Sequence, residues 1–167
     1  AIKPLIESLC DESFDVQSEA AEVLKNYGKK VIPHLKTAFS SDKVEIRTWV
    51  SRILGQLLGK EAMTFFKNML ASDKRELRYY AVSALEEIGD MESLELILSK
   101  LCDPSFLVRV QVADILKRKG EMIVPSLLSI LKKGSTDEKY HAARVIYTVM
   151  GGASVQILKD IIGIYDL

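Results

Sequence analysis

The chain has 167 residues, a formal net charge of zero, 48% hydrophobic residues and 28% charged residues. This length suits a single domain, and the apolar content excludes a disordered chain. The balanced charge argues against a dedicated binder of nucleic acid or of anionic membranes. No apolar run reaches the roughly 20 residues of a membrane-spanning helix. We therefore expect neither nucleic acid nor membrane as a partner.

Cysteine and histidine are scarce. The two cysteines, Cys10 and Cys102, are too few for a disulfide scaffold and suit a reducing compartment, so we expect a cytoplasmic protein. The two histidines, His34 and His141, occur in no metal-binding spacing. We expect no metal site and no cofactor.

The sequence repeats at nearly constant intervals. Five similar segments each end in a glycine, and successive glycines are 31, 30, 31 and 31 residues apart. These are Gly28, Gly59, Gly89, Gly120 and Gly151. Five copies at one interval indicate a repeat protein. A single domain over residues 1–167 is expected, with repeats over 1–28, 29–59, 60–89, 90–120 and 121–151 and a terminal helix over 152–167.

Each repeat reads as two helices. Apolar residues recur at three- and four-residue spacing both before and after each glycine, as in amphipathic helices. The shorter helix of each pair, helix A, is expected over residues 2–10, 31–40, 61–71, 92–101 and 122–133, and a last helix over 154–165. The longer one, helix B, is expected over residues 14–27, 43–58, 74–88, 104–119 and 136–150.

Capping residues support these boundaries. Ser135 and Glu138 have the spacing of a capping box at the start of a helix B. The same N-capping role is expected of three aspartates: Asp42, Asp73 and Asp103. The repeated glycines are expected to form left-handed caps at the other end of each helix B.

A helix pair of this kind cannot bury both of its apolar faces alone. We therefore expect an all-α fold, a right-handed α–α superhelix (solenoid) of about five stacked helix pairs plus a final helix. Stacking would hold Cys10 and Cys102, three repeats apart, too far from each other for a disulfide. Small residues are expected on the buried seam, namely Ala20, Ala21, Ala81, Ala84, Ala113, Ala142 and Ala143.

The repeated segments follow the form Asp-(x)4–5-Val/Leu/Ile-Arg-x-x-Ala-x-x-x-Leu-(x)3-Gly. They resemble short HEAT-like repeats of the phycobilisome-lyase type, over essentially the whole chain. The resemblance implies a polar ladder that joins turn aspartates and helix-B arginines between repeats, here Asp42, Asp73, Asp103, Arg47, Arg78 and Arg109. The first and fifth copies have Gln17 and Lys139 in place of the arginine, so the ladder should weaken at both ends.

The resemblance also implies that helix B lines the concave face. Aligned copies of helix B present aromatic and cationic residues there: Trp49, Arg52, Tyr79, Tyr80, Tyr140, His141 and Arg144. Aromatic and arginine side chains supply much of the energy at protein interfaces. We therefore expect a non-catalytic scaffold or adaptor that binds a protein or peptide on this face. The alternative is that Trp49 and the tyrosines pack sideways against adjacent repeats.

Other functions stay open as alternatives. Resemblance to the lyase-type repeats implies a subunit that attaches a chromophore, its partner or another enzyme accessory. HEAT-like DNA glycosylases bind nucleic acid in a basic groove. The corresponding residues here mix the two charges: Glu22, Arg52, Ser83, Asp114 and Arg144. Deoxyhypusine hydroxylases hold iron with His-Glu pairs, and neither His34 nor His141 is followed by glutamate. No nucleophile–base pair is apparent, so we expect no catalytic residues.

Two further segments have distinctive compositions. The stretch from Gly55 to Lys60, GQLLGK, departs from a phosphate-binding loop and lies inside a predicted helix. The last helix is apolar on more than one side, through Val155, Ile157, Leu158, Ile161, Ile162 and Ile164. The sequence also begins without Met and inside a helical pattern, so we expect a longer parent protein, or self-association at one end.

Overall fold

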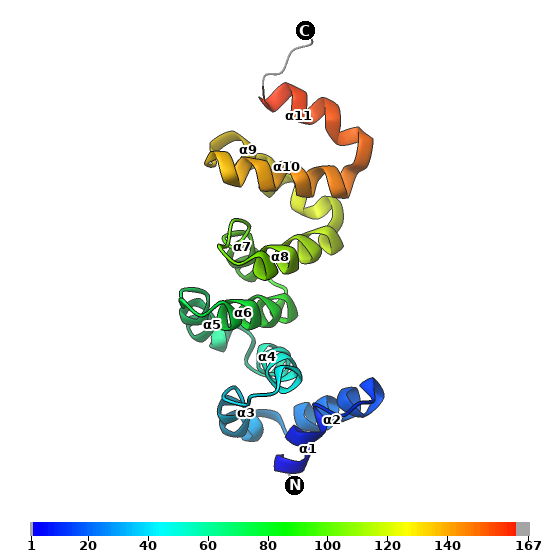
Figure 1. Cartoon of the computed structure of the whole chain (residues 1–167), viewed down its shortest axis with the longest axis vertical. Coiled ribbons are helices and arrows are strands. Elements are labelled where there is room, and N and C mark those ends of the chain that lie inside the picture. Colours follow the sequence, from blue (N-terminus) through cyan, green and yellow to red (C-terminus); the bar gives the residue numbers. More distant parts are fainter. Residues whose placement is uncertain (1, 163–167) are drawn as a thin grey trace. The chain divides into compact units, whose positions relative to one another are not determined.

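The computed structural model describes residues 2–162, and every regular element among these residues is a helix (Figure 1). The all-α class predicted from the sequence is confirmed for this part of the chain. Two compact units divide the chain, residues 1–96 and residues 97–167. Each unit consists of short and long helices in alternation, which is the predicted pattern.

The first unit contains three helix pairs. They are α1 (Ile2–Ser8) with α2 (Phe14–Asn26), α3 (Ile32–Ala38) with α4 (Val44–Leu58), and α5 (Met63–Leu70) with α6 (Arg75–Ile88). The 3-10 turns η1 (Gly28–Val31) and η2 (Gly59–Ala62) precede α3 and α5, and α7 (Met91–Leu98) follows α6. Among the helices B, α4 packs against both α2 and α6, so each pair covers the apolar face of the next.

The second unit repeats this arrangement. It contains α8 (Phe106–Lys119), η3 (Gly120–Ile123), α9 (Val124–Lys133), α10 (Thr136–Met150), η4 (Gly151–Ala153) and α11 (Ser154–Ile162). Here α10 packs against α8, α9 and α11. Observed helix bounds lie within a few residues of the predicted ones, and the main difference is that a 3-10 turn opens several helices A.

Small side chains allow the close packing of helices B. Ala81 and Ala84 are fully buried in α6, and Ala20, Ala21 and Ala142 are buried as predicted, whereas Ala113 and Ala143 are only half-buried. The backbones approach closely at Gly55 in α4, where an added Cβ would lie 2.5 Å from the Ala84 carbonyl oxygen of α6. Gly55 therefore has a packing role, which agrees with the rejection of its segment as a phosphate loop.

The repeated glycines end the helices B with two different geometries. All five have a positive φ, as predicted, and no other described residue has one. Gly89 is left-handed, with ψ of 9°. Gly59, Gly120 and Gly151 instead have ψ near −130° to −144°, and a 3-10 turn follows each. The predicted left-handed cap is thus wrong for these three, because their backbone turns directly into the next helix A.

Four of the described turns that lead into helix B share one hydrogen-bond pattern. A side-chain oxygen accepts a hydrogen bond from the backbone N–H two residues later, which is the N-cap of the helix. The four acceptors are Asp11, Ser41, Ser72 and Asp103, whose partners are Ser13, Lys43, Lys74 and Ser105. Such turns fix the chain direction before the first helical residue.

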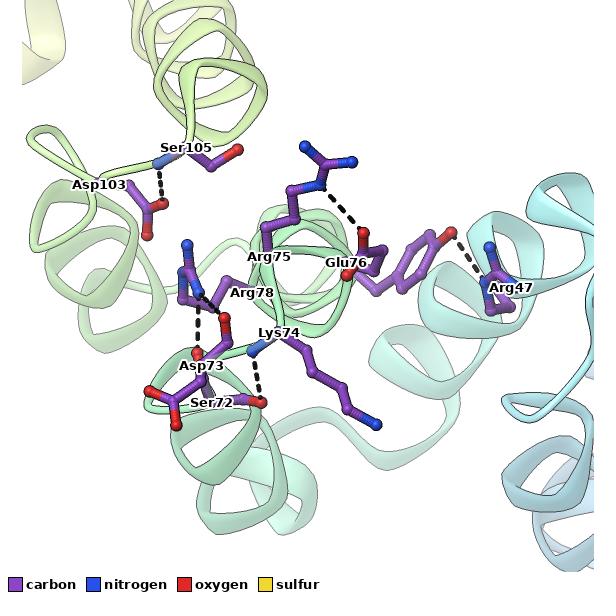
Figure 2. A network of polar contacts seen from close by, with 10 residues as sticks. Arg47, Ser72, Asp73, Lys74, Arg75, Glu76, Arg78, Asp103 and Ser105 are labelled. Carbon is purple, nitrogen blue, oxygen red and sulfur yellow. Dashed lines mark hydrogen bonds and ion pairs between the residues drawn. The ribbon is translucent and has the colours of Figure 1, made fainter.

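A long polar side chain from helix B completes each of these turns. In α6, the Arg78 Nη1 donates to the Ser72 and Asp73 carbonyl oxygens at 2.9 and 3.0 Å (Figure 2). The equivalent donors elsewhere are Gln17 to Asp11, Arg47 to Ser41, and Arg109 to Asp103. Gln17 makes the equivalent hydrogen bond in the first repeat, and the weakening of the ladder there stays a prediction.

These turns correct two predictions. The residue equivalent to Asp103 is a serine in the second and third repeats, so the alignment of Asp42 and Asp73 with Asp103 was wrong by one residue. The N-caps there are Lys43 and Lys74, and neither aspartate caps its helix. Asp103 is also not the N-cap, which is Ser105. The ladder between the aspartates and arginines of different repeats stays a prediction.

The fifth helix B begins differently. The Ser135 hydroxyl accepts a hydrogen bond from the Glu138 N–H at 3.3 Å, and the Glu138 carboxylate accepts one from the Ser135 N–H at 2.7 Å. This reciprocal pair is the predicted capping box, which is confirmed. The Ser135 backbone N–H and the Ser135 hydroxyl both donate to the Glu138 carboxylate, and these two hydrogen bonds hold the pKa of Glu138 below its usual value.

Candidate functional site

An open groove of about 260 Å³ lies between the two helices B of the second unit. Positions three or four residues apart share one face of a helix, so each helix contributes a strip of side chains. The strip from α8 contains Phe106, Arg109, Val110, Ala113, Asp114 and Lys117. The strip from α10 contains His141, Arg144, Val145 and Thr148, and Leu101 precedes α8. We call this surface the α8–α10 groove.

The α8–α10 groove combines an apolar floor with a charged rim. Leu101 and Val145 are buried in the floor, whereas Asp114, Lys117 and Arg144 are exposed. These exposed residues include two cations and one carboxylate, and half-buried Arg109 is a further cation. The groove therefore has an excess of positive charge. The remaining lining is largely aliphatic or aromatic.

Both arginines of the α8–α10 groove lie over aromatic rings. The Arg144 Cζ is 5.7 Å from the centroid of the Tyr140 ring, and the Arg109 Cζ is 5.9 Å from that of Phe106. The two rings are 60% and 68% exposed. Stacking of this kind restricts the arginine side chains while leaving the aromatic rings accessible to a partner.

His141 lies between these cations. Its pKa is lowered mainly by burial, and further by the positive charges of Arg109 and Arg144. Its ring also contacts that of Tyr140, with centroids 5.2 Å apart. At neutral pH His141 therefore presents a mostly uncharged imidazole to the groove. The structure thus brings together three predicted site residues: Tyr140, His141 and Arg144.

The helix-B face of the first unit has a different character. The Trp49 Nε1 donates to the Gln17 Oε1 at 2.9 Å, and its ring lies 5.9 Å from that of Phe14. Both contacts join α4 to α2, so Trp49 packs sideways on the preceding repeat, which was the expected alternative. Arg52 lies 6.0 Å from the Trp49 ring and 3.8 Å from the Glu87 carboxylate. These two predicted residues are half-buried.

Tyr80 is a correction among the predicted site residues. It is only 3% exposed, so the expectation that it faces a partner was wrong. The Arg47 Nε donates to the Tyr80 hydroxyl at 3.0 Å, and the Phe39 ring lies 6.2 Å from the tyrosine ring. Contacts from the preceding helix pair therefore bury it. Its neighbour Tyr79 is half-buried.

The α8–α10 groove also contains functional candidates that the sequence did not single out. Lys117 lies in the last turn of α8, and Arg109 was expected only as a member of the polar ladder. Lys117 is two turns after Val110 in the same strip, and this spacing was the signal that could have found it. Arg109 has both roles, because its Nη1 binds the turn before α8 and its side chain lines the groove.

Several other features carry less information on function. No group of three or more His, Cys, Asp or Glu side chains within residues 2–162 is arranged to hold a metal ion. Both thiols are free, as predicted. None of the helices in the described part of the chain has both the length and the hydropathy to cross a membrane.

The last helix is only partly covered. Val155 is exposed in α11, and Ile157, Leu158 and Ile161 are half-buried. Ile164 lies outside the described residues, as does the side chain of Ile162. Self-association at this end stays a prediction.

Comparison with known protein families agrees with the repeated helix pairs. The family model for HEAT repeats matches residues 63–148, just over half of the chain, and this range includes both walls of the α8–α10 groove. The chain therefore belongs to the HEAT-repeat family. Such repeats commonly serve as protein-binding scaffolds. The comparison with curated proteins gave no match. The lyase-type subclass stays a prediction.

Proposed function

We propose that this chain is a non-catalytic scaffold or adaptor that binds a protein or peptide partner through its helix-B side chains. The observation that carries the proposal is the α8–α10 groove, where two arginines lie over exposed aromatic rings beside an apolar floor. Such a surface offers both apolar area to bury and polar groups that orient a ligand.

Tyr140 and Arg144 are the proposed centre of this interface. Tyrosine and arginine are enriched among the residues that dominate binding energy, and they act best where a partner excludes water from them. Tyr140 is 60% exposed, so it has much of its ring left to bury. Its contact with Arg144 holds both side chains in place before binding, which lowers the entropic cost.

The helix-B residues of the first unit have a secondary place in the proposal. Trp49 and Arg52 already bind other repeats, and Tyr79 is half-buried. We propose that they extend the contact surface rather than anchor the partner. Binding in the cytoplasm suits a chain with two unpaired thiols.

Selection from a displayed library of random peptides tests this function without knowledge of the partner. The full chain is the bait, and the selected peptides are measured against two double variants by fluorescence polarisation. Tyr140→Ala with Arg144→Ala removes one lining residue of the groove, Arg144, and the exposed ring that Arg144 lies over. Met122→Ala with Lys132→Ala is the matched control, since both residues are exposed and lie outside the groove.

We expect the groove variant to weaken binding by at least about tenfold, the effect of losing roughly 1.4 kcal/mol, and the control to bind as the wild type does. Circular dichroism should show the same helical content in all three proteins. If the selected peptides bind the groove variant as tightly as the wild type, the proposed surface is wrong.

A further inference from the structure

We propose that the segment bound in the α8–α10 groove is acidic: a short extended peptide whose carboxylates lie between Arg109, Lys117 and Arg144 and whose apolar side chain covers Val110, which is 40% exposed. This inference rests on the proposed function and specifies the chemistry of the partner. It follows from charge, from the fixed geometry of the cations and from the length of the groove.

Charge complementarity is the first argument. Three cationic side chains line the groove against a single carboxylate, that of Asp114. His141 lies among them, and the arginines contribute to lowering its pKa, so the imidazole adds little positive charge near pH 7. The groove is thus positive although the whole chain has a net charge of zero. An acidic segment neutralises this excess, whereas a basic one would meet a single carboxylate in the lining, Asp114, and Asp137 near His141.

The second argument is that the cations are held before binding. The Arg109 Nη1 donates to the carbonyl oxygens of Asp103 and Pro104 at 2.6 and 3.1 Å, and its Cζ lies near the Phe106 ring. Arg144 is similarly held over Tyr140. A planar guanidinium presents several N–H groups in one fork that matches a carboxylate. Restricting it beforehand reduces the entropy lost on binding.

Groove length sets the size of the segment. The α8 strip runs from Phe106 to Lys117, which is about 16 Å at ~1.5 Å per helical residue. An extended peptide spans this distance with about five residues at roughly 3.3 Å each. Alternate side chains of such a peptide point to the same side, so carboxylates and an apolar side chain can both enter the groove.

A peptide is favoured over a nucleic acid by the composition of the lining. Phosphate backbones are bound by repeated cations along a surface, with affinity that depends on how many phosphates are neutralised. Here Asp114 interrupts the cations, and Val110, Ala113 and Val145 form an apolar surface between them. Such a surface suits an apolar side chain flanked by carboxylates.

The test compares three synthetic pentapeptides that share a central Phe and differ in the charge of the flanking side chains. Their sequences are Glu-Asp-Phe-Asp-Glu, its amide analogue Gln-Asn-Phe-Asn-Gln, and its basic analogue Lys-Arg-Phe-Arg-Lys, each with blocked ends. Binding to the full chain is followed by the shifts of backbone amide signals in NMR spectra. A thymidine oligonucleotide of twenty nucleotides is titrated in parallel.

The acidic peptide should shift the amide signals of residues 109–117 and 141–148. The amide analogue should bind about tenfold more weakly, because each lost ion pair is worth up to ~1 kcal/mol. Lys117→Glu with Arg144→Glu should transfer the preference to the basic peptide. Lys132→Glu with Lys133→Glu changes the charge equally on α9, outside the groove, and should bind like the wild type.

Other outcomes overturn the inference in distinguishable ways. Equal binding of the amide analogue at the same residues would remove the acidic requirement and leave the proposed function standing. Shifts of these residues by the oligonucleotide alone would assign the groove to nucleic acid. No shift by any peptide, together with failure of the library selection, would overturn both the inference and the proposed function.

Discussion

Replacing Gly55 with alanine tests the packing between α4 and α6. This glycine lies within the helix α4 (Val44–Leu58), where the helix closely approaches the backbone of α6. In an isolated helix the substitution would stabilise, because glycine is about 1 kcal/mol less favourable than alanine in a helix interior. Here we expect the opposite sign.

The magnitude follows from the space at this position. The new Cβ would lie 2.5 Å from the Ala84 carbonyl oxygen and 3.2 Å from the Ala84 Cα, and real Cβ contacts essentially never fall below 3.0 Å. A backbone oxygen cannot rotate away, so α6 must shift by several tenths of an ångström. Overpacking of this kind costs about 1–3 kcal/mol, and we take the upper part of that range. After subtracting the helix preference, the free energy of unfolding should fall by about 2 kcal/mol.

Urea unfolding followed by tryptophan fluorescence is the assay. The single tryptophan, Trp49, lies in the same helix, so its signal reports on the α4 region. Gln56→Ala is the control, because this neighbouring side chain is exposed and loses only a surface hydrogen bond to Glu87, which should change stability by no more than about 1 kcal/mol. If Gly55→Ala were as stable as the wild type or more stable, the close approach of α4 and α6 would be refuted.

Three further predictions concern polar residues. Arg78→Met should lower the free energy of unfolding by about 1–3 kcal/mol, because the turn carbonyl oxygens lose a buried hydrogen-bond donor. Urea unfolding should show that Arg78→Lys does not restore the wild-type stability. Since the folded-state pKa of Glu138 is lowered, its stabilising effect is complete above its unfolded pKa and is lost as the pH falls through the folded value. The difference in melting temperature between the wild type and Glu138→Gln should therefore shrink as the pH falls from 7 to 3. In NMR titrations His141 should have a pKa below that of an unperturbed histidine, and Arg144→Gln should raise it by removing one nearby cation.

The helices and their ends could be predicted from the sequence because they depend on local chemistry. Apolar periodicity determines which residues are helical, and a positive φ at Gly89 requires glycine whatever surrounds it. Capping by Ser135 and Glu138 is equally local, since the two residues are three apart. The ψ values of Gly59, Gly120 and Gly151 could not be predicted, because they depend on how the next helix A packs.

The errors came from contacts between repeats and from alignment by residue type. Tyr80 has the spacing of an exposed residue, and it is buried because Phe39 and Arg47 approach it from the preceding pair. Asp42 and Asp73 were aligned with Asp103 because all three are aspartates. Their turns use the preceding serines instead, since a hydroxyl oxygen accepts the same hydrogen bond as a carboxylate.

The candidate site was predicted in part. Alignment of the helices B placed Tyr140, His141 and Arg144 on one face, and the structure brings them together on α10. The groove itself could not be predicted, because it requires the distance and orientation between α8 and α10. The place of Arg109 in the groove was not predicted, because its sequence pattern indicated only a structural role. Arg109 binds the turn before α8 and also lines the groove.

The most direct test of the binding surface is photochemical crosslinking inside the cell that makes this protein. A photoreactive amino acid replaces Asp114 within the α8–α10 groove in one variant, and Lys132 on α9 in the other, both of which are exposed positions. We predict that illumination gives a discrete protein adduct at position 114 and none at position 132. An adduct at position 132 together with none at position 114 would contradict the claim that helix B carries the partner.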